Sequence, residues 1–211
     1  MGKVYGWMFL GLVMTAVVSF YVYISGISTV IFSNPMLWVV VMLAELGLVI
    51  FLSARILKMS FAAATASFML YSALNGLTLS MIFIVYRLGS IAVVFGITAL
   101  LFGAMSVVGM LTKRDLSKAG PLLLVGLFGI IVASIVNMFL NSSTLYYIIS
   151  YLGVAIFLGL TAYDTNKIKK IYNIYGGTDK EGNVAILGSL SLYLDFVNLL
   201  LFLLRIFGRR N

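Results

Sequence analysis

The chain has 211 residues, of which 63% are hydrophobic and 9% are charged, whereas a soluble domain carries about 25% charged residues. This composition excludes a water-soluble protein, because only a lipid bilayer can surround so much apolar surface. The formal charge of +8 does not indicate nucleic-acid binding. The basic residues stand at the ends of apolar runs, where they act as topology determinants and contact lipid headgroups.

The absence of Cys and His limits the chemistry that the chain can perform. It excludes disulfides, thiolate nucleophiles, imidazole bases and the usual protein ligands of zinc and haem. No G-x-G-x-x-G or P-loop pattern is present, and no connection is long enough to hold a soluble domain. We therefore expect no cofactor and predict that the protein is not an enzyme.

Seven apolar runs follow one another along the chain, each long enough for the helix of about 20 residues that crosses a hydrocarbon core. They cover residues 4–24, 36–57, 61–86, 89–111, 121–141, 145–163 and 184–207. Turn residues or charges separate them, as at residues 33–35, 113–115 and 141–143, and the longest polar stretch runs from Asp164 to Asn183. The pattern predicts an all-α polytopic membrane protein with a single transmembrane domain over residues 1–211.

The distribution of Lys and Arg predicts a cytoplasmic N-terminus. In that orientation ten basic residues lie on the inner side, and four lie on the outer side: Arg87, Arg205, Arg209 and Arg210. The basic C-terminus fits poorly and would be explained by a last segment that dips into the membrane and returns. We favour seven full spans, because residues 184–207 form a long run without proline.

Three of the six acidic residues lie within or at the end of apolar spans. A charge at the centre of a membrane helix costs at least ~2.5 kcal/mol, so such residues are functional candidates by default. The three are Glu45, Asp164 and Asp195. The other three, Asp115, Asp179 and Glu181, are expected in loops.

Asp195 is the strongest candidate, because it lies about 16–18 Å from either end of the last span. It belongs to a stripe of residues spaced three and four apart: Gly188, Ser191, Asp195, Asn198, Phe202 and Arg205. The rest of that helix is apolar, which is typical of a helix in the middle of a bundle whose stripe faces a cavity or a polar partner. The alternative is a structural hydrogen-bond anchor.

Asp164 ends the sixth span and shares a helix face with Gly153, Phe157, Leu160 and Lys167. Alone, it could be an ordinary charge at a helix end. It can approach Asp195 if the sixth helix continues past it, as the basic residues within 167–170 indicate. Two neighbouring carboxylates in a low dielectric would share one proton and titrate as a unit, and their oxygens would also suit Ca²⁺.

Glu45 lies near the middle of the second span, and Arg55 follows on broadly the same side of the helix. About 15 Å of helix rise separates them, so we expect them along one pathway rather than in a direct pair. Alternatively, Glu45 only bonds to a neighbouring helix.

Two motifs resemble those of the Bax inhibitor-1 family, the transmembrane Bax-inhibitor-motif proteins. The first is Tyr163-Asp164 within residues 161–169, and the second is S-L-Y-L-D-F-x-N-L at residues 191–199, with residues 203–208 after it. The likeness is greatest to the small bacterial members. The resemblance implies seven helices, with two three-helix layers around a central C-terminal helix, in the inner membrane of a bacterium.

The resemblance also implies a passive, pH-sensitive calcium leak, with calcium as the permeant ion. Asp164 and Asp195 match the coupled aspartates whose protonation switches the cytoplasmic end of the path. Glu45 matches an acidic position proposed along the ion path, where we also place Asn198. Transient calcium contacts would come from Asp195, Asp164 and Glu45. Arg55 falls near a basic position of the family, and we consider Arg55 and Arg205 for gating or pairing.

Three other functions stay open. A non-catalytic regulator would bind another membrane protein, such as a membrane-anchored quality-control protease, and could coexist with a leak. An intramembrane aspartyl protease also carries a Tyr-Asp pair, but its G-x-G-D motif is replaced here by L-Y-L-D at residues 192–195. A proton-coupled transporter would use buried acids as a relay, although the sequence indicates no substrate pocket.

Overall fold

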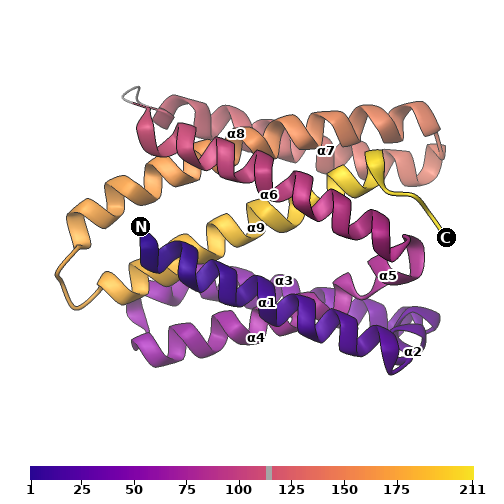
Figure 1. Cartoon of the computed structure of the whole chain (residues 1–211), viewed down its shortest axis with the longest axis horizontal. Coiled ribbons are helices and arrows are strands. Elements are labelled where there is room, and N and C mark those ends of the chain that lie inside the picture. The colour runs from indigo at the N-terminus through magenta and orange to yellow at the C-terminus, as the bar shows by residue number, and fades with distance from the viewer. Residues whose placement is uncertain (113–115) are drawn as a thin grey trace. The chain divides into compact units, whose positions relative to one another are not determined.

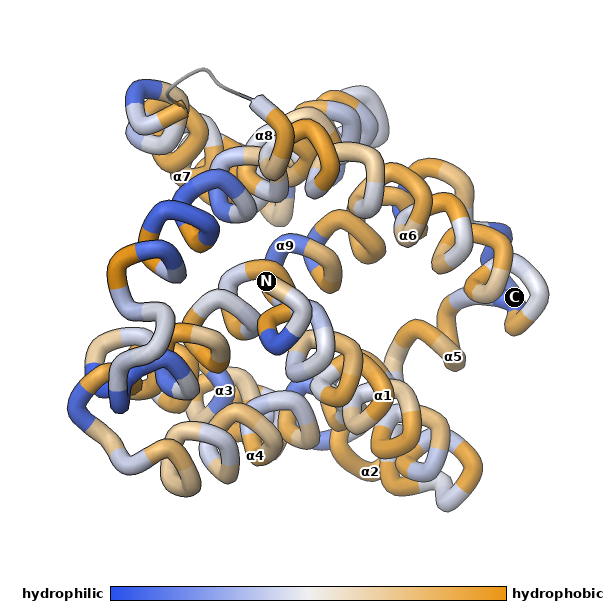
Figure 2. Tube along the Cα trace, turned by 60° about the vertical axis from the view of Figure 1, so that its left-hand side comes forward, coloured by the Kyte–Doolittle hydropathy of each residue, from blue (hydrophilic) through white to orange (hydrophobic). Residues whose placement is uncertain are grey.

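The computed structural model describes residues 1–112 and 116–211, so the predicted loop acid Asp115 lies outside the described residues. The described residues form seven helices that are long and apolar enough to cross a membrane, judged by length and composition. Apolar residues dominate each of these helices, and hydrophilic residues gather at helix ends and connections (Figure 2). The prediction of an all-α polytopic membrane protein is therefore confirmed.

The long helices follow the predicted order of spans. They are α1 (Gly2–Ile24), α3 (Pro35–Arg55), α4 (Phe61–Leu79), α6 (Leu88–Leu111), α7 (Ala119–Leu140), α8 (Ser143–Tyr175) and α9 (Glu181–Phe207). Two short helices, α2 (Ile27–Ser33) and α5 (Met81–Val85), extend the connections after α1 and α4. Single 3-10 turns follow α3 at Ile56–Lys58 and precede α7 at Leu116–Lys118.

Local sequence explains where helices begin and end. The Asn34 side chain accepts hydrogen bonds from the backbone N–H of Met36 (3.0 Å) and Leu37 (3.3 Å), and Pro35 occupies the first turn of α3. Asn caps and first-turn prolines are strongly favoured, because they satisfy or remove N–H groups that have no partner within the helix. At the C-terminal end of α7, Asn141 adopts the left-handed conformation that commonly ends a helix, with φ of 49°.

α8 is longer than the predicted span 145–163, because the helix continues to Tyr175. The stretch from Asp164 to Asn183, which we predicted as the longest polar connection, is therefore helical over its first twelve residues and again from Glu181. Charged residues end a membrane span but do not end a helix. The chain has no Gly or Pro between Leu160 and Gly176, and the turn comes at Gly177, whose φ of 77° favours glycine.

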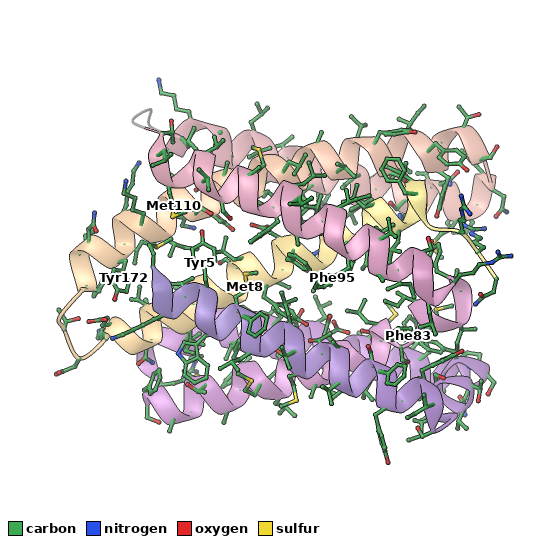
Figure 3. All side chains as sticks on the ribbon, viewed as in Figure 1. Tyr5, Met8, Phe83, Phe95, Met110 and Tyr172 are labelled. Carbon is green, nitrogen blue, oxygen red and sulfur yellow. The ribbon has the colours of Figure 1, made fainter. Side chains whose placement is uncertain are left out.

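The chain divides into two compact units, each built from three spans and one half of α9. Unit 1 comprises residues 1–87, 171–193 and 210–211. Within it α1 and α4 lie side by side (Figure 1). Glycines permit this close approach, since a Cβ at Gly76 would come within 2.9 Å of the Thr15 carbonyl oxygen. Near the C-terminal end of α1, Phe20 packs edge-on against Phe83 (Phe83 is labelled in Figure 3), with ring centroids 5.9 Å apart.

Unit 2 comprises residues 88–170 and 194–209. α6 packs on α9 through Phe95 and Phe102, whose ring centroids lie 5.3 and 5.4 Å from that of Phe196. α6 packs on α8 at Gly109, where a Cβ would meet the carbonyl oxygen of Ala162. The aromatic contacts and the glycine contact therefore join α6 to both helices that carry the predicted aspartates.

α9 is the most buried of the seven long helices that the described residues form. Of its most apolar 18-residue stretch 67% is buried, compared with 6% for the spans that contain α3 and α7. This burial agrees with the prediction that the last helix belongs in the middle of a bundle. α9 is also unbroken from Glu181 to Phe207, so this segment does not turn back within the membrane as the re-entrant alternative required.

Candidate functional site

The register between α8 and α9 places Asp164 opposite Asp195. Phe157 on α8 packs against Phe202 on α9, with ring centroids 5.8 Å apart, and Gly153 leaves room for the same Phe202 ring. A step of seven residues forward along α8 and seven back along α9, about two helical turns in each, leads to Asp164 and Asp195. The two carboxylates interact electrostatically. The structure thus brings together the two residues that the sequence singled out.

Asp195 lies near the middle of α9, and only 4% of its surface is exposed. Its Oδ2 atom is buried and has no hydrogen-bond partner among residues 1–112 and 116–211. Asp164 is half-buried, and the Lys167 ammonium one turn later acts on it electrostatically. A buried carboxylate oxygen without a donor is costly, because desolvation is not compensated by a hydrogen bond. A proton or a cation at Oδ2 would offset that cost.

The other predicted residues of the α9 stripe have different surroundings. The Asn198 side chain is half-buried and donates to the Leu194 carbonyl of its own helix at 2.8 Å. Arg205 is exposed, and its guanidinium lies over the rings of Tyr146 (5.7 Å) and Phe202 (5.0 Å). The contacts recorded for Arg205 are thus with aromatic faces, where cations are attracted by the ring quadrupole.

Glu45 belongs to unit 1, in a hydrogen-bonded network that the sequence did not reveal. The Asn75 amide on α4 donates to the Glu45 carboxylate on α3. The Tyr193 hydroxyl on α9 donates to the side-chain amide oxygen of Asn75 at 3.0 Å, and it lies 2.6 Å from the Thr15 hydroxyl on α1. The signal available was Asn75, an amide within an apolar span. This network joins α1, α3, α4 and α9 within unit 1.

The Tyr193→Phe variant is expected to lower the free energy of unfolding by about 1–3 kcal/mol, because the Asn75 oxygen loses a buried donor. Thermal unfolding of the purified protein in detergent measures the loss. Tyr5→Phe is the matched control, since the Tyr5 hydroxyl is buried without a partner among the described residues. If both variants unfold like the wild type, the network does not stabilise unit 1.

Glu181 was expected in a solvated loop, and that expectation is wrong. It lies in the first turn of α9, where acidic residues are favoured by the helix dipole. Its carboxylate accepts from the Lys3 ammonium (2.7 Å), the Tyr172 hydroxyl (2.6 Å; Tyr172 is labelled in Figure 3) and the Gly177 N–H (2.9 Å). These contacts place the start of α1 and the connection between α8 and α9 at one end of unit 1.

The opposite end of unit 1 holds the C-terminus. The Asn211 N–H donates to the Val85 carbonyl (3.0 Å), and its side chain donates to the Ile84 carbonyl (3.0 Å), at the end of α5.

Arg55 is exposed in the last turn of α3. Within the described part of the chain, no three Asp, Glu, His or Cys residues gather into a group that could hold a metal ion.

The seven long apolar helices define a polytopic α-helical membrane protein, and unit 2 of that protein holds the nearly fully buried Asp195. The family model described as inhibitor of apoptosis-promoting Bax1 matches residues 1–211. The chain therefore belongs to the Bax inhibitor-1 family, which confirms the resemblance noted from its motifs.

Curated relatives match over nearly the whole chain. The inner membrane protein YbhL of Escherichia coli K12 is 50% identical over 214 residues, which cover 100% of this chain and 92% of that protein. An uncharacterized protein of Borreliella burgdorferi is 48% identical, covering 100% and 92%. A Rickettsia prowazekii protein is 38% identical, covering 99% and 89%. None of these three names is that of an enzyme, and the first supports a multi-pass location in the inner membrane.

Proposed function

We propose that this protein is a passive calcium leak gated by protonation of the Asp164–Asp195 pair. The observation that carries the proposal is the register of α8 and α9: the contact between Phe157 and Phe202 sets Asp164 opposite Asp195 inside unit 2, and Asp195 is almost fully buried. Two adjacent carboxylates in a low dielectric do not both ionise cheaply, so they hold one proton between them. Loss of that proton adds one negative charge at membrane depth and increases the electrostatic repulsion between the Asp164 carboxylate on α8 and the Asp195 carboxylate on α9.

Calcium is the permeant ion that this chemistry favours. Ca²⁺ is bound by oxygen ligands in flexible geometry, and carboxylates, amides and hydroxyls are the polar side chains that the spans offer in the absence of Cys and His. We assign Glu45, in unit 1, and Asn198, in unit 2, to ion conduction. Both carry a side-chain oxygen, and both are half-buried.

The distribution of positive charge supports a cytoplasmic N-terminus. Lys3 and the connection between α8 and α9 share one end of unit 1 through the Lys3–Glu181 ion pair. In this orientation Asp164, which ends the apolar part of α8, faces the cytoplasmic half of the membrane. Protonation from the cytoplasm would then set the state of the leak.

Calcium flux into liposomes that hold the purified protein, measured between pH 5 and 8, tests the proposal. We expect flux above that of protein-free liposomes, with a clear dependence on pH. Flux no greater than in protein-free liposomes would overturn the leak. Cleavage of a model transmembrane substrate, lost on substitution of either aspartate, would assign the pair to a protease instead.

A further inference from the structure

Two buried hydroxyl groups in unit 2 differ from their neighbours. The hydroxyls of the other buried Ser and Thr residues within its spans donate to the carbonyl four residues earlier on the same helix: Thr98 to Val94, Ser150 to Tyr146, and Thr161 to Phe157, each at 2.7 Å. Ser106 and Thr165 are 3% and 0% exposed, yet neither hydroxyl has a partner among the described residues. Their free lone pairs need an explanation, because bonding back to the helix is the ordinary solution.

The packing of α6 places Ser106 between α8 and α9. Phe102, one turn before Ser106, contacts Phe196 of α9, the residue that follows Asp195. Gly109, one turn after Ser106, packs against α8, where a Cβ would lie 2.9 Å from the Cβ of Thr165. Phe102, Ser106 and Gly109 share one helix face by their spacing of four and three residues. Ser106 therefore stands where α6 passes from its contact with α9 to its contact with α8.

Three buried oxygens without a partner among the described residues thus belong to the three helices that pack together here: Ser106 Oγ on α6, Thr165 Oγ1 on α8 and Asp195 Oδ2 on α9. A buried polar atom without a partner is costly because its lost hydration is not replaced, so together these oxygens favour a bound species that supplies positive charge. Asp164 adds a second carboxylate nearby, on the residue before Thr165. The nearest cation on that helix, Lys167, points its ammonium over the Tyr163 ring at 5.8 Å.

We propose that Ser106 and Thr165 act with Asp195 as ligands of the permeating divalent cation, forming an oxygen site between α6, α8 and α9. This inference rests on the proposed calcium leak and names further residues for it. Ca²⁺ takes 6–8 oxygen ligands, so water would complete the shell around a carboxylate and two hydroxyls. Neutral hydroxyls bind more weakly than carboxylates, and a permeation site must release its ion as readily as it binds it.

The test replaces the hydroxyls without changing side-chain volume greatly. Ser106→Ala, Thr165→Val and the double variant are compared with Thr98→Val and Thr161→Val, whose hydroxyls are already bonded within their own helices. Calcium flux into liposomes and the shift in melting temperature caused by Ca²⁺, with Mg²⁺ as the comparison ion, are measured for all five. We expect the double variant to lose about tenfold in flux and most of the Ca²⁺-induced shift, and the controls to stay within about twofold of wild type.

The outcomes separate this site from the leak itself. If the wild type conducts and the double variant conducts equally well with the same Ca²⁺-induced shift, the hydroxyl site is wrong and the leak stands. If the wild type does not conduct calcium, the proposed leak function is wrong. In that case a Ca²⁺-induced shift that the double variant loses supports the binding site, and a shift that it retains overturns it. Should the double variant unfold, the single variants give the same comparison.

Discussion

The Asp195→Asn variant is expected to conduct calcium with nearly the same flux at pH 5 and pH 8, within about twofold, whereas the wild-type flux changes several-fold over that range. The amide is close to the carboxylic acid in shape but cannot lose a proton. In this variant Asp164 has no second carboxylate with which to share a proton. In the wild type the two carboxylates interact. The measurement is the proteoliposome flux at four or five pH values, with the amount of reconstituted protein matched.

Two further variants test whether the effect comes from the aspartate pair. Asp164→Asn should flatten the profile in the same way, since either aspartate alone cannot share a proton with a partner. Asp179→Asn removes a carboxylate that is exposed in the connection between α8 and α9, and it should leave the profile unchanged. A wild-type profile in Asp195→Asn would refute proton sharing by the pair. Flattening by Asp179→Asn as well would indicate a general effect of charge.

The Gly109→Ala variant is expected to lower the free energy of unfolding by more than about 2 kcal/mol, because its Cβ would meet the backbone carbonyl oxygen of Ala162. A backbone atom cannot rotate away as a side chain can, so α6 and α8 would have to separate. Their separation would also break the hydrogen bond that the Asn166 side chain donates to the Gly109 carbonyl at 3.2 Å. Thermal or denaturant unfolding in detergent micelles measures the loss.

Gly103 on the same helix provides the matched control. A Cβ there has no neighbour within 4 Å, and the residue is exposed. Gly103→Ala should therefore be neutral or stabilise the helix by about 0.5–1 kcal/mol, the ordinary preference of a helix for Ala over Gly. Equal melting temperatures for the two variants would show that the contact between α6 and α8 at Gly109 does not limit stability.

Much of the fold follows from local patterns in the sequence. α3 (Pro35–Arg55) starts at Pro35 because Asn34 caps it, and both residues can be recognised in the sequence as helix-start signals. The C-terminal end of α8 could not be predicted in the same way. The charges after Asp164 end an apolar run, but the helix continues to Tyr175. Hydrophobicity reports where a membrane span ends, and only backbone preferences report where a helix ends.

The candidate site was only partly accessible from sequence. Helical spacing placed Asp164 on a face with Gly153 and Phe157, and Asp195 on a face with Phe202. It could not tell which residues of the two faces meet. A slip of one turn between α8 and α9 would move the carboxylates about 5.4 Å apart along the helix axes. The packing of Phe157 on Phe202, with Gly153 making room, is what sets the register.

By itself, the sequence determined a membrane protein with seven helices, few acids and a family membership, because composition and helical period are local properties. Only the tertiary structure decided which polar groups have partners. Glu45 gained Asn75, whereas Ser106, Thr165 and one oxygen of Asp195 have no partner within the described residues. Those outcomes depend on contacts between residues far apart in the chain, whose distances and directions only the packed helices define.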